Sequence, residues 1–174
     1  MIAAVLAGGR SRRMGRAKAV VPLGGRPLVA WPLAAAAAAG LEPVVVAKPG
    51  SELPPGVTAW LEPEELSHPL AGLVCALERA GAPVVALACD MPFVTPALVA
   101  RLAALDGAAS VKDHPFPGRY EPAALPVLRD ALAREASVKE ALAALAPAEI
   151  DADPRELEGV NTPEELRAAS LRLE

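Results

Sequence analysis

Short apolar runs alternate along this chain with longer amphipathic segments, and glycine, proline and polar residues separate them. Continuous apolar runs bounded by such residues are typical of buried strands, and we expect strands at 2–7, 44–47, 57–60 and 84–88. Apolar residues at helical spacing predict a helix over 70–80. A further helix is expected over 27–39, where Pro27 suits a first turn and Pro32 either kinks the helix or marks its true start.

The second half of the chain carries clear signals for helix starts. Thr95 followed by Pro96 is an N-cap with a first-turn proline, and capping boxes are expected at Ser137/Glu140 and Thr162/Glu165. Strands are expected at 108–112 and 119–125 on either side of the turn-rich segment HPFPG, with a short one at 149–150. The alternation of strands and helices therefore continues to the last helix.

This alternation predicts an α/β fold. We expect residues 1–174 to form a single domain with a mostly parallel, Rossmann-like sheet and helices on both faces. Ligands of such sheets bind beyond the carboxyl ends of the strands. Two polar features stand at such ends, namely the loop that begins at Gly8 after the first strand and Asp90 after the strand at 84–88.

Composition narrows the class of ligand. The formal net charge is −4, whereas a protein that binds nucleic acid carries positive charge over a whole face. Cys75 and Cys89 lack metal-ligand spacing and are expected to be reduced core thiols. The sequence begins with no basic stretch typical of a signal peptide, and no apolar segment is long enough to cross a bilayer, so we expect a cytoplasmic protein without nucleic-acid or membrane partners.

Positive charge is instead concentrated in LAGGRSRRMGRAK, residues 6–18, which holds five basic residues and three glycines. Adjacent glycines let backbone N–H groups approach an anion, and Arg13 and Lys18 add a guanidinium fork and a mobile ammonium. The segment lacks both the Gly-Lys-Ser/Thr ending of a Walker A loop and the alternating glycines of a dinucleotide-binding loop. It therefore predicts a different kind of phosphate site. Arg10, Arg12 and Arg16 are expected to face solvent or a second anionic substrate.

Four blocks of sequence resemble the molybdenum cofactor guanylyltransferases of the nucleotidyltransferase superfamily. They are Leu6-Ala7-Gly8-Gly9 with Arg13-Met14-Gly15, Lys18 and Pro22-Leu23-x-Gly25-x-Pro27-Leu28; Pro69-Leu70-Ala71-Gly72; Cys89-Asp90-Met91-Pro92; and Val160-Asn161-Thr162-Pro163-Glu164-Glu165-Leu166. The resemblance implies transfer of GMP from GTP to the phosphate of molybdopterin, with release of pyrophosphate.

The resemblance also implies roles for the charged residues. Asp90 would be the ligand of Mg²⁺, which takes one or two carboxylates and completes its shell with phosphates and water. Lys18 and Arg13 would stabilise the α-phosphate and the leaving group, with the amides of Gly8 and Gly9 behind them. Because two anions must meet, catalysis is expected to rest on positioning and charge neutralisation.

The base of the nucleotide is expected beside two of these blocks. The resemblance implies contacts from Leu6, Ala7 and Gly8 and from the turn that holds Pro69, Leu70 and Gly72. Glu62 is a candidate for accepting hydrogen bonds from the N1 and N2 groups of guanine, and Glu64 or Glu65 could serve instead.

Few residues of the sequence indicate where the acceptor substrate binds. The family motif suggests that the Asn161 side chain binds the pterin substrate, although an ordinary asparagine before a helix has the same appearance. The chain departs from the family pattern at Ala17, Ala47 and Gly159, and the loop before Ser137 lacks the arginines that relatives offer to the pterin.

Two alternatives remain open. The first is a cytidylyltransferase or sugar-phosphate nucleotidyltransferase of the same superfamily, and the second is a non-catalytic nucleotide-binding module. The expected partners are GTP and molybdopterin, with transient contact to other proteins of the cofactor pathway, and a monomer is expected.

Overall fold

A seven-stranded sheet forms the centre of the computed structural model, which describes residues 1–8, 17–65 and 68–173. The strand order is β5-β4-β1-β6-β8-β7-β9. The strands are β1 (Ile2–Leu6), β4 (Glu42–Ala47), β5 (Ala59–Leu61), β6 (Val84–Ala88), β7 (Ala109–Val111), β8 (His114–Tyr120) and β9 (Ala148–Ile150). Only β8 runs antiparallel to its neighbours, so the sheet is mostly parallel, as predicted.

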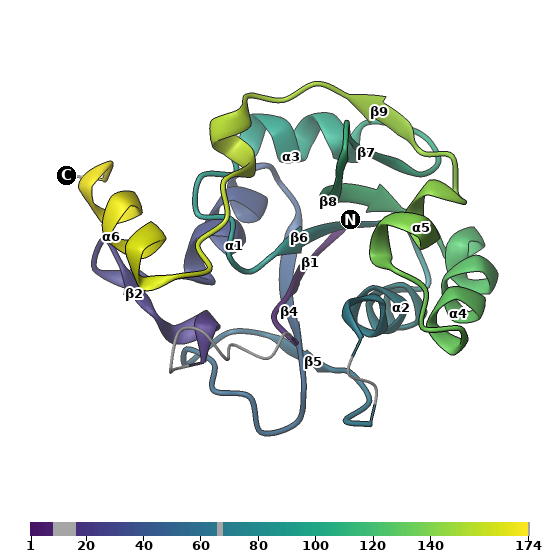
Figure 1. Ribbon diagram of the computed structural model, residues 1–174, viewed down its shortest axis with the longest axis horizontal. Coiled ribbons are helices and arrows are strands. Elements are labelled where there is room, and N and C mark those ends of the chain that lie inside the picture. The colour runs from purple at the N-terminus through teal and green to yellow at the C-terminus, as the bar shows by residue number, and fades with distance from the viewer. Residues whose placement is uncertain (9–16, 66–67, 174) are drawn as a thin grey trace.

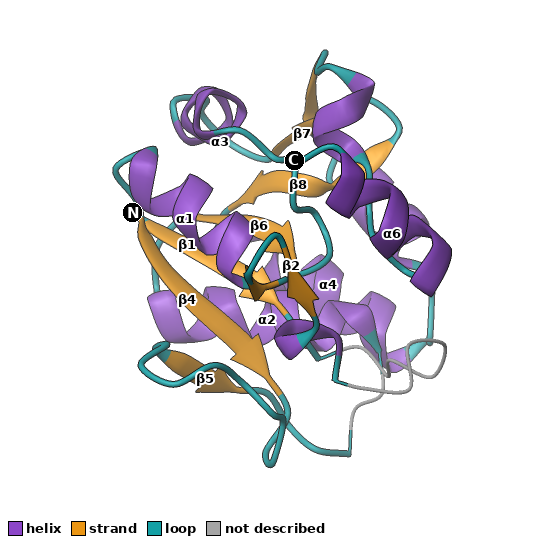
Figure 2. Ribbon diagram, turned by 90° about the vertical axis from the view of Figure 1, so that its left-hand side faces the viewer, coloured by secondary structure: helices purple, strands orange, loops and turns teal. Residues whose placement is uncertain are grey.

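Helices cover both faces of this sheet (Figures 1 and 2). The α-helices are α1 (Ala30–Ala38), α2 (Pro69–Ala80), α3 (Pro96–Ala103), α4 (Leu125–Ala133), α5 (Val138–Ala143) and α6 (Pro163–Leu171). Three 3₁₀ turns, η1 (Lys18–Val20), η2 (Pro122–Ala124) and η3 (Pro154–Leu157), and a small β2–β3 hairpin (Pro22–Leu23 and Arg26–Pro27) complete the described elements.

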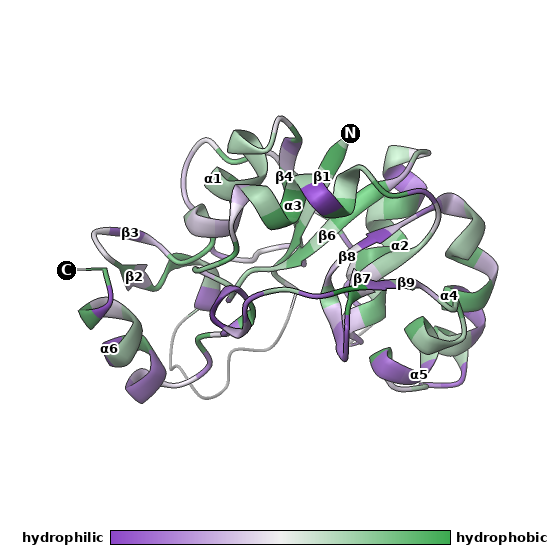
Figure 3. Cartoon of the chain, turned by 90° about the horizontal axis from the view of Figure 1, so that it is seen from above, coloured by the Kyte–Doolittle hydropathy of each residue, from purple (hydrophilic) through white to green (hydrophobic). Residues whose placement is uncertain are grey.

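Alternate residues of the central strands enter two separate cores. Val5, Val45 and Leu87 pack with α1 and α3, whereas Ala4 and Val46 pack on the opposite face with α2, α4 and α5. Successive side chains of a strand point to opposite faces, so the continuous apolar runs of β1, β4 and β6 supply both cores. Figure 3 shows the resulting hydrophobic centre and the more hydrophilic α6 at the periphery.

The predicted helix starts are present, except that one capping box is incomplete and one helix begins later than expected. Thr95 and Thr162 cap α3 and α6 through their hydroxyls, and Thr162 forms the complete capping box with Glu165. Ser137 caps α5 by accepting from the backbone N–H of Glu140, but the Glu140 carboxylate lies near Arg134 and does not complete the predicted capping box. The helix expected from residue 27 begins only at residue 30, so Pro32 lies in its first turn, where a missing N–H costs no helical hydrogen bond.

The segment after β7 was predicted wrongly. HPFPG is not a turn but the beginning of β8, and the chain reverses earlier, at Lys112 and Asp113. Asp113 has φ of 62°, a left-handed conformation that Asp tolerates in tight hairpin turns. Residues 121–125, expected to be a strand, instead lead into η2 and α4.

The carboxyl ends of β1, β4, β5 and β6 meet at one edge of the sheet because these strands are parallel. Gly8, Lys48, Glu62 and Asp90 follow these strands in that order. This edge therefore collects most of the polar residues that the sequence singled out. No helix in the described part of the chain is long and apolar enough to cross a bilayer.

Candidate functional site

A cluster of three side chains lies at the centre of this edge. The Nζ atom of Lys18 in η1 donates to Asp90 Oδ2 at 2.5 Å and to Asn161 Oδ1 at 2.7 Å. The side chains of Lys18 and Asp90 are 16% and 20% exposed, so the ion pair is only partly screened by water. Three segments that are far apart in the sequence thus meet at one ammonium group.

Backbone contacts hold the cluster in place. Asp90 lies two residues after the end of β6, and the N–H of Val160 donates to the carbonyl of Asp90 at 2.8 Å. The N–H of Asn161 donates to the Glu165 carboxylate at 2.6 Å, which links the asparagine to the capping box of α6. The carboxylate and the amide are therefore fixed by elements on both sides.

The donors at this cluster suit a hard cation that shares its shell with a ligand. Among the described residues, no group of three or more His, Cys, Asp and Glu side chains is arranged to enclose a metal ion. Mg²⁺ commonly binds one or two carboxylates and keeps phosphate oxygens and water as its other ligands. Asp90, with the Asn161 amide oxygen nearby, fits that pattern.

A second site lies around Glu62, which follows β5. Its side chain is 4% exposed, and a Cβ atom placed on Gly8 would lie 2.0 Å from its Oε1. A Cβ on Gly72 in α2 would lie 3.1 Å from Oε2 and 3.4 Å from Leu6 Cδ2. The structure thus brings Leu6, Gly8, Glu62 and Gly72 together, and the two glycines leave the space that the carboxylate fills.

Lys48 is a neighbour of this carboxylate that the sequence analysis missed. Its Nζ lies 3.6 Å from Glu62 Oε1 and donates to the carbonyls of Pro63 and Glu64 at 3.3 and 3.2 Å. The sequence did contain a signal for Lys48, because this residue directly follows β4 at the carboxyl edge of the sheet. Burial raises the pKa of Glu62, and Lys48 opposes that effect by favouring the charged form.

The other residues predicted for the site differ in how far their side chains are exposed. Leu70 is fully buried in the core of α2, and Pro69 begins that helix, which His68 caps through the N–H of Leu70. Glu64 and Glu65, the alternatives to Glu62, are exposed. Ala7 continues from β1, its N–H donating to the Val46 carbonyl. Gly9, Arg10, Arg12, Arg13 and Arg16 lie outside the described residues.

The two cysteines lie beside the site but inside the core, Cys89 directly before Asp90 and Cys75 near Glu62. Cys75 and Cys89 are buried free thiols, and burial raises the pKa of Cys89 to about 12. Cys75 donates to the Leu61 carbonyl, and burial raises its pKa as well. Both thiols therefore stay protonated near neutral pH, as expected of core residues.

Comparison with known proteins identifies relatives of the chain. Residues 3–153 match the family model of the MobA-like NTP transferase domain. A molybdenum cofactor guanylyltransferase of Rhodobacter capsulatus is 34% identical over 97% of this chain and 94% of its own length. One of Xanthomonas euvesicatoria pv. vesicatoria is 36% identical over 81% of this chain and 68% of its own length.

Solved structures with a similar fold were also found. Molybdopterin-guanine dinucleotide biosynthesis protein A of Archaeoglobus fulgidus has a TM-score of 0.79 at 25% identity, over 99% of this chain and 98% of that one. The 2-C-methyl-D-erythritol 4-phosphate cytidylyltransferase of Thermus thermophilus has a TM-score of 0.74 at 22% identity, over 98% of both chains, and shares the fold.

The close approach of Gly8 to Glu62 generates a stability prediction. Gly8→Ala should lower the free energy of unfolding by roughly 1–3 kcal/mol, because the new methyl group overpacks a buried carboxylate. In a Glu62→Ala background the same substitution should cost much less, since the clashing group is gone. Urea unfolding of the four proteins measures both costs. Equal costs in the two backgrounds would contradict the contact.

Proposed function

Because this chain belongs to the MobA-like NTP transferase family and is a nucleotidyltransferase, we propose that it transfers GMP from GTP to the phosphate of molybdopterin with the help of Mg²⁺. A phosphate oxygen of molybdopterin attacks the α-phosphorus of GTP, and the bond from that phosphorus to the bridging oxygen breaks. Pyrophosphate leaves, and molybdopterin guanine dinucleotide is formed. The observation that carries the proposal is the meeting of Lys18, Asp90 and Asn161 at the carboxyl edge of the sheet.

The chain's own residues supply charge and position in this reaction. Lys18 stabilises negative charge on the α-phosphate and the departing pyrophosphate, and its contacts with Asp90 and Asn161 aim its ammonium group. Arg13, outside the described residues, adds a second positive charge, as the family resemblance implies. Backbone amides at Gly8 and Gly9 complete the phosphate site. No side-chain nucleophile is needed, because the acceptor's phosphate attacks directly.

Asp90 is the residue that would hold Mg²⁺, with the Asn161 oxygen close to the same carboxylate. When bound, Mg²⁺ neutralises charge on the triphosphate and polarises its oxygens. The pairing of Asp90 with Lys18 keeps a negative and a positive group side by side, one suited to the cation and the other to phosphate. Asp90 and Asn161 therefore offer oxygen ligands of the kind that Mg²⁺ prefers.

Glu62 selects the base. Its carboxylate is buried and lies 3.6 Å from the Lys48 ammonium. The N1 and N2 groups of guanine are two donors that a carboxylate accepts side by side, and they would replace the hydration that burial removes. Cytosine and adenine do not present that pair of donors at one edge, so the same carboxylate disfavours them.

The proposal predicts a large loss of activity in Asp90→Asn. The variant keeps the shape of the side chain but loses its charge, and we expect the turnover number to fall by about a hundredfold or more. Pyrophosphate release with Mg²⁺, GTP and molybdopterin is the measurement. Asp130→Asn on the exposed surface of α4 is a matched control and should retain activity. Unimpaired turnover in Asp90→Asn would remove the assignment of Asp90.

Nucleotide preference provides a separate prediction. Glu62→Gln should raise the KM for GTP by roughly 10–100-fold, because a charged acceptor of about 1.5–3 kcal/mol is lost, and should narrow the preference for GTP over CTP and ATP. The exposed Glu64→Gln is its control. Pyrophosphate release from wild type with each triphosphate sets the baseline. Turnover with CTP in place of GTP, or only with a sugar phosphate as acceptor, would replace the proposed activity by one of its alternatives.

A further inference from the structure

Helix α6 packs on the hairpin that follows Lys18. A small third core lies between the helix and the hairpin, and it includes Leu23 of β2, Leu28 and Ala169 of α6. This core is separate from the two cores on the faces of the sheet, and Figure 1 shows α6 beside β2, away from the central strands. Because η1, which contains Lys18, is followed by β2, this core anchors α6 next to the lysine.

Glu165 of α6 makes one contact more than a helix cap requires. A capping box needs the N3 carboxylate to accept from the N–H of the N-cap residue, here Thr162, and Glu165 Oε2 does so at 3.1 Å. The same oxygen also accepts from the N–H of Asn161 at the shorter distance of 2.6 Å. Hydrogen bonds to a charged acceptor are about twice as strong as neutral ones. The carboxylate therefore holds the backbone of Asn161 as well as the start of the helix.

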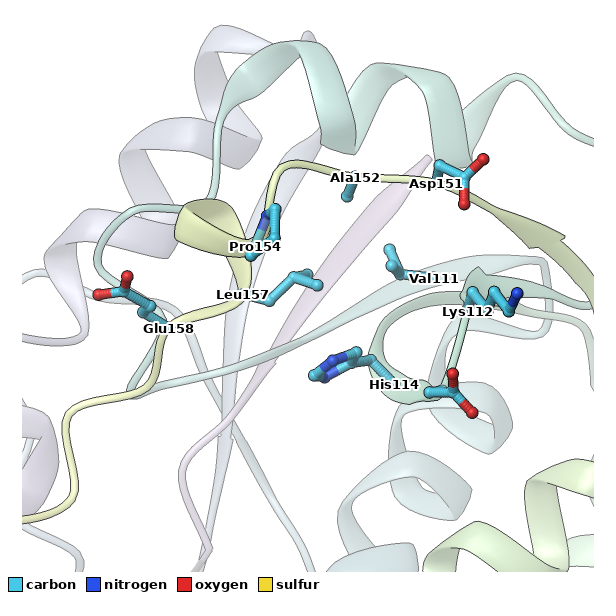
Figure 4. Close-up of a pocket in the computed structure, with 9 residues that line it drawn as sticks. Val111, Lys112, His114, Asp151, Ala152, Pro154, Leu157 and Glu158 are labelled. Atoms are coloured by element: carbon cyan, nitrogen blue, oxygen red, sulfur yellow. The ribbon is translucent and has the colours of Figure 1, made fainter.

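The segment before Asn161 has little packing of its own on one side. Leu157 and Glu158 line a pocket of about 470 Å³ (Figure 4), so a cavity lies there in place of packed side chains. Side chains beside a cavity lose part of the contacts that hold a packed chain in position. The next residue, Gly159, has no side chain. The position of Asn161 therefore depends strongly on the contact with Glu165.

Asn161 transmits this constraint to Lys18. The Lys18 Nζ atom donates to Asn161 Oδ1 at 2.7 Å and to Asp90 Oδ2 at 2.5 Å. An ammonium group has three N–H donors, and two fixed acceptors define how it is oriented. If Asn161 moved away, the ammonium group could turn about its bond to Asp90. The contact between Glu165 and Asn161 thus acts on the direction of a charge that Glu165 itself does not touch.

We propose that Glu165 is a positioning residue of the transfer reaction, which holds the backbone of Asn161 and thereby orients the Lys18 ammonium group toward the transferred phosphate. The assignment rests on the proposed function, because Lys18 acts on phosphate in that reaction. Charge builds up on the phosphates in the transition state, so the orientation of Lys18 affects that state more than the binding of GTP. Losing Glu165 should therefore lower the turnover number and leave the KM for GTP almost unchanged.

The kinetic test compares two neighbouring carboxylates of α6, with each variant assayed well below its melting temperature. Glu165→Ala should lower the turnover number about fivefold or more. Glu164→Ala is the matched control, because Glu164 is exposed in the same first turn and has only Arg167 nearby as an ion-pair partner; it should retain wild-type turnover. Glu165→Gln keeps an acceptor of the same reach and should recover most of the loss. Equal losses in Glu164→Ala and Glu165→Ala would overturn the role.

A second comparison asks whether Glu165 acts through Asn161. In an Asn161→Ala background, Glu165→Ala should lower the turnover number by less than twofold, because the side chain that Glu165 positions is already absent. Losses that multiply in the double variant would contradict this route.

The composition of the chain provides a readout that does not depend on activity. Asn161 is the only asparagine and the chain contains no glutamine, so its side-chain NH₂ group gives the only carboxamide pair in a ¹H–¹⁵N NMR spectrum. Glu165→Ala should shift or broaden this pair in the ligand-free protein, whereas Glu164→Ala should leave it in place. The remaining signals show whether each variant is folded.

The two readouts separate the two proposals. A carboxamide pair that does not move in folded Glu165→Ala would overturn the positioning role and leave the proposed reaction standing. A wild-type protein that releases no pyrophosphate with Mg²⁺, GTP and molybdopterin would overturn the proposed reaction, and with it the part that Glu165 has in it.

Discussion

The Lys18 ammonium group is the point on which the site depends, because it joins segments that are 72 and 143 residues away in the sequence. Lys18 reaches Asp90 at the end of β6 and Asn161 before α6. Each partner is fixed by its own backbone contacts, Asp90 through Val160 and Asn161 through Glu165. An ion pair that is mostly shielded from water tolerates the loss of one partner poorly. The same contacts that hold the ammonium group in place, which we propose binds phosphate, therefore also tie the C-terminal segment to the sheet.

The direction of the strands explains why the chemistry gathers where it does. The carboxyl ends of parallel strands lie at one edge of a sheet. The residues that follow β1, β4, β5 and β6 therefore lie near one another, and they are Gly8, Lys48, Glu62 and Asp90. The antiparallel β8 begins at the same edge, so His114 lies there beside Val111 at the end of β7. With the base proposed at Glu62, Asp90 lies between that site and the half of the sheet formed by β8, β7 and β9.

The sequence predicted most of the fold because its signals are local. Apolar runs identified β1, β4 and β6, and the hydroxyls of Thr95, Ser137 and Thr162 identified helix starts. The region after β7 was mispredicted because two prolines and a glycine in HPFPG suggest a turn, whereas pairing with β6 and β7 holds that segment as a strand. A tertiary contact of this kind overrides local turn preference.

The candidate site was predictable in part, because some of its residues also stand in local sequence motifs. Lys18, Asp90 and Glu62 were singled out from motif positions, and the structure places Lys18 against Asp90 and Glu62 against Gly8. Lys48 was missed because its meaning depends on β4 and β5 being adjacent and parallel, so that Lys48 and Glu62 leave the sheet side by side.

The central claim is that Asp90 and Lys18 mark the place where the phosphates and the metal meet. A crystal structure of the protein with Mn²⁺ and a non-hydrolysable GTP analogue tests it most directly, because anomalous scattering locates the metal independently of the protein model. We predict a metal peak bound to the Asp90 carboxylate, with the α-phosphate beside Lys18 and the guanine at Glu62. A metal bound elsewhere, or a triphosphate that lies away from Lys18, would contradict the account.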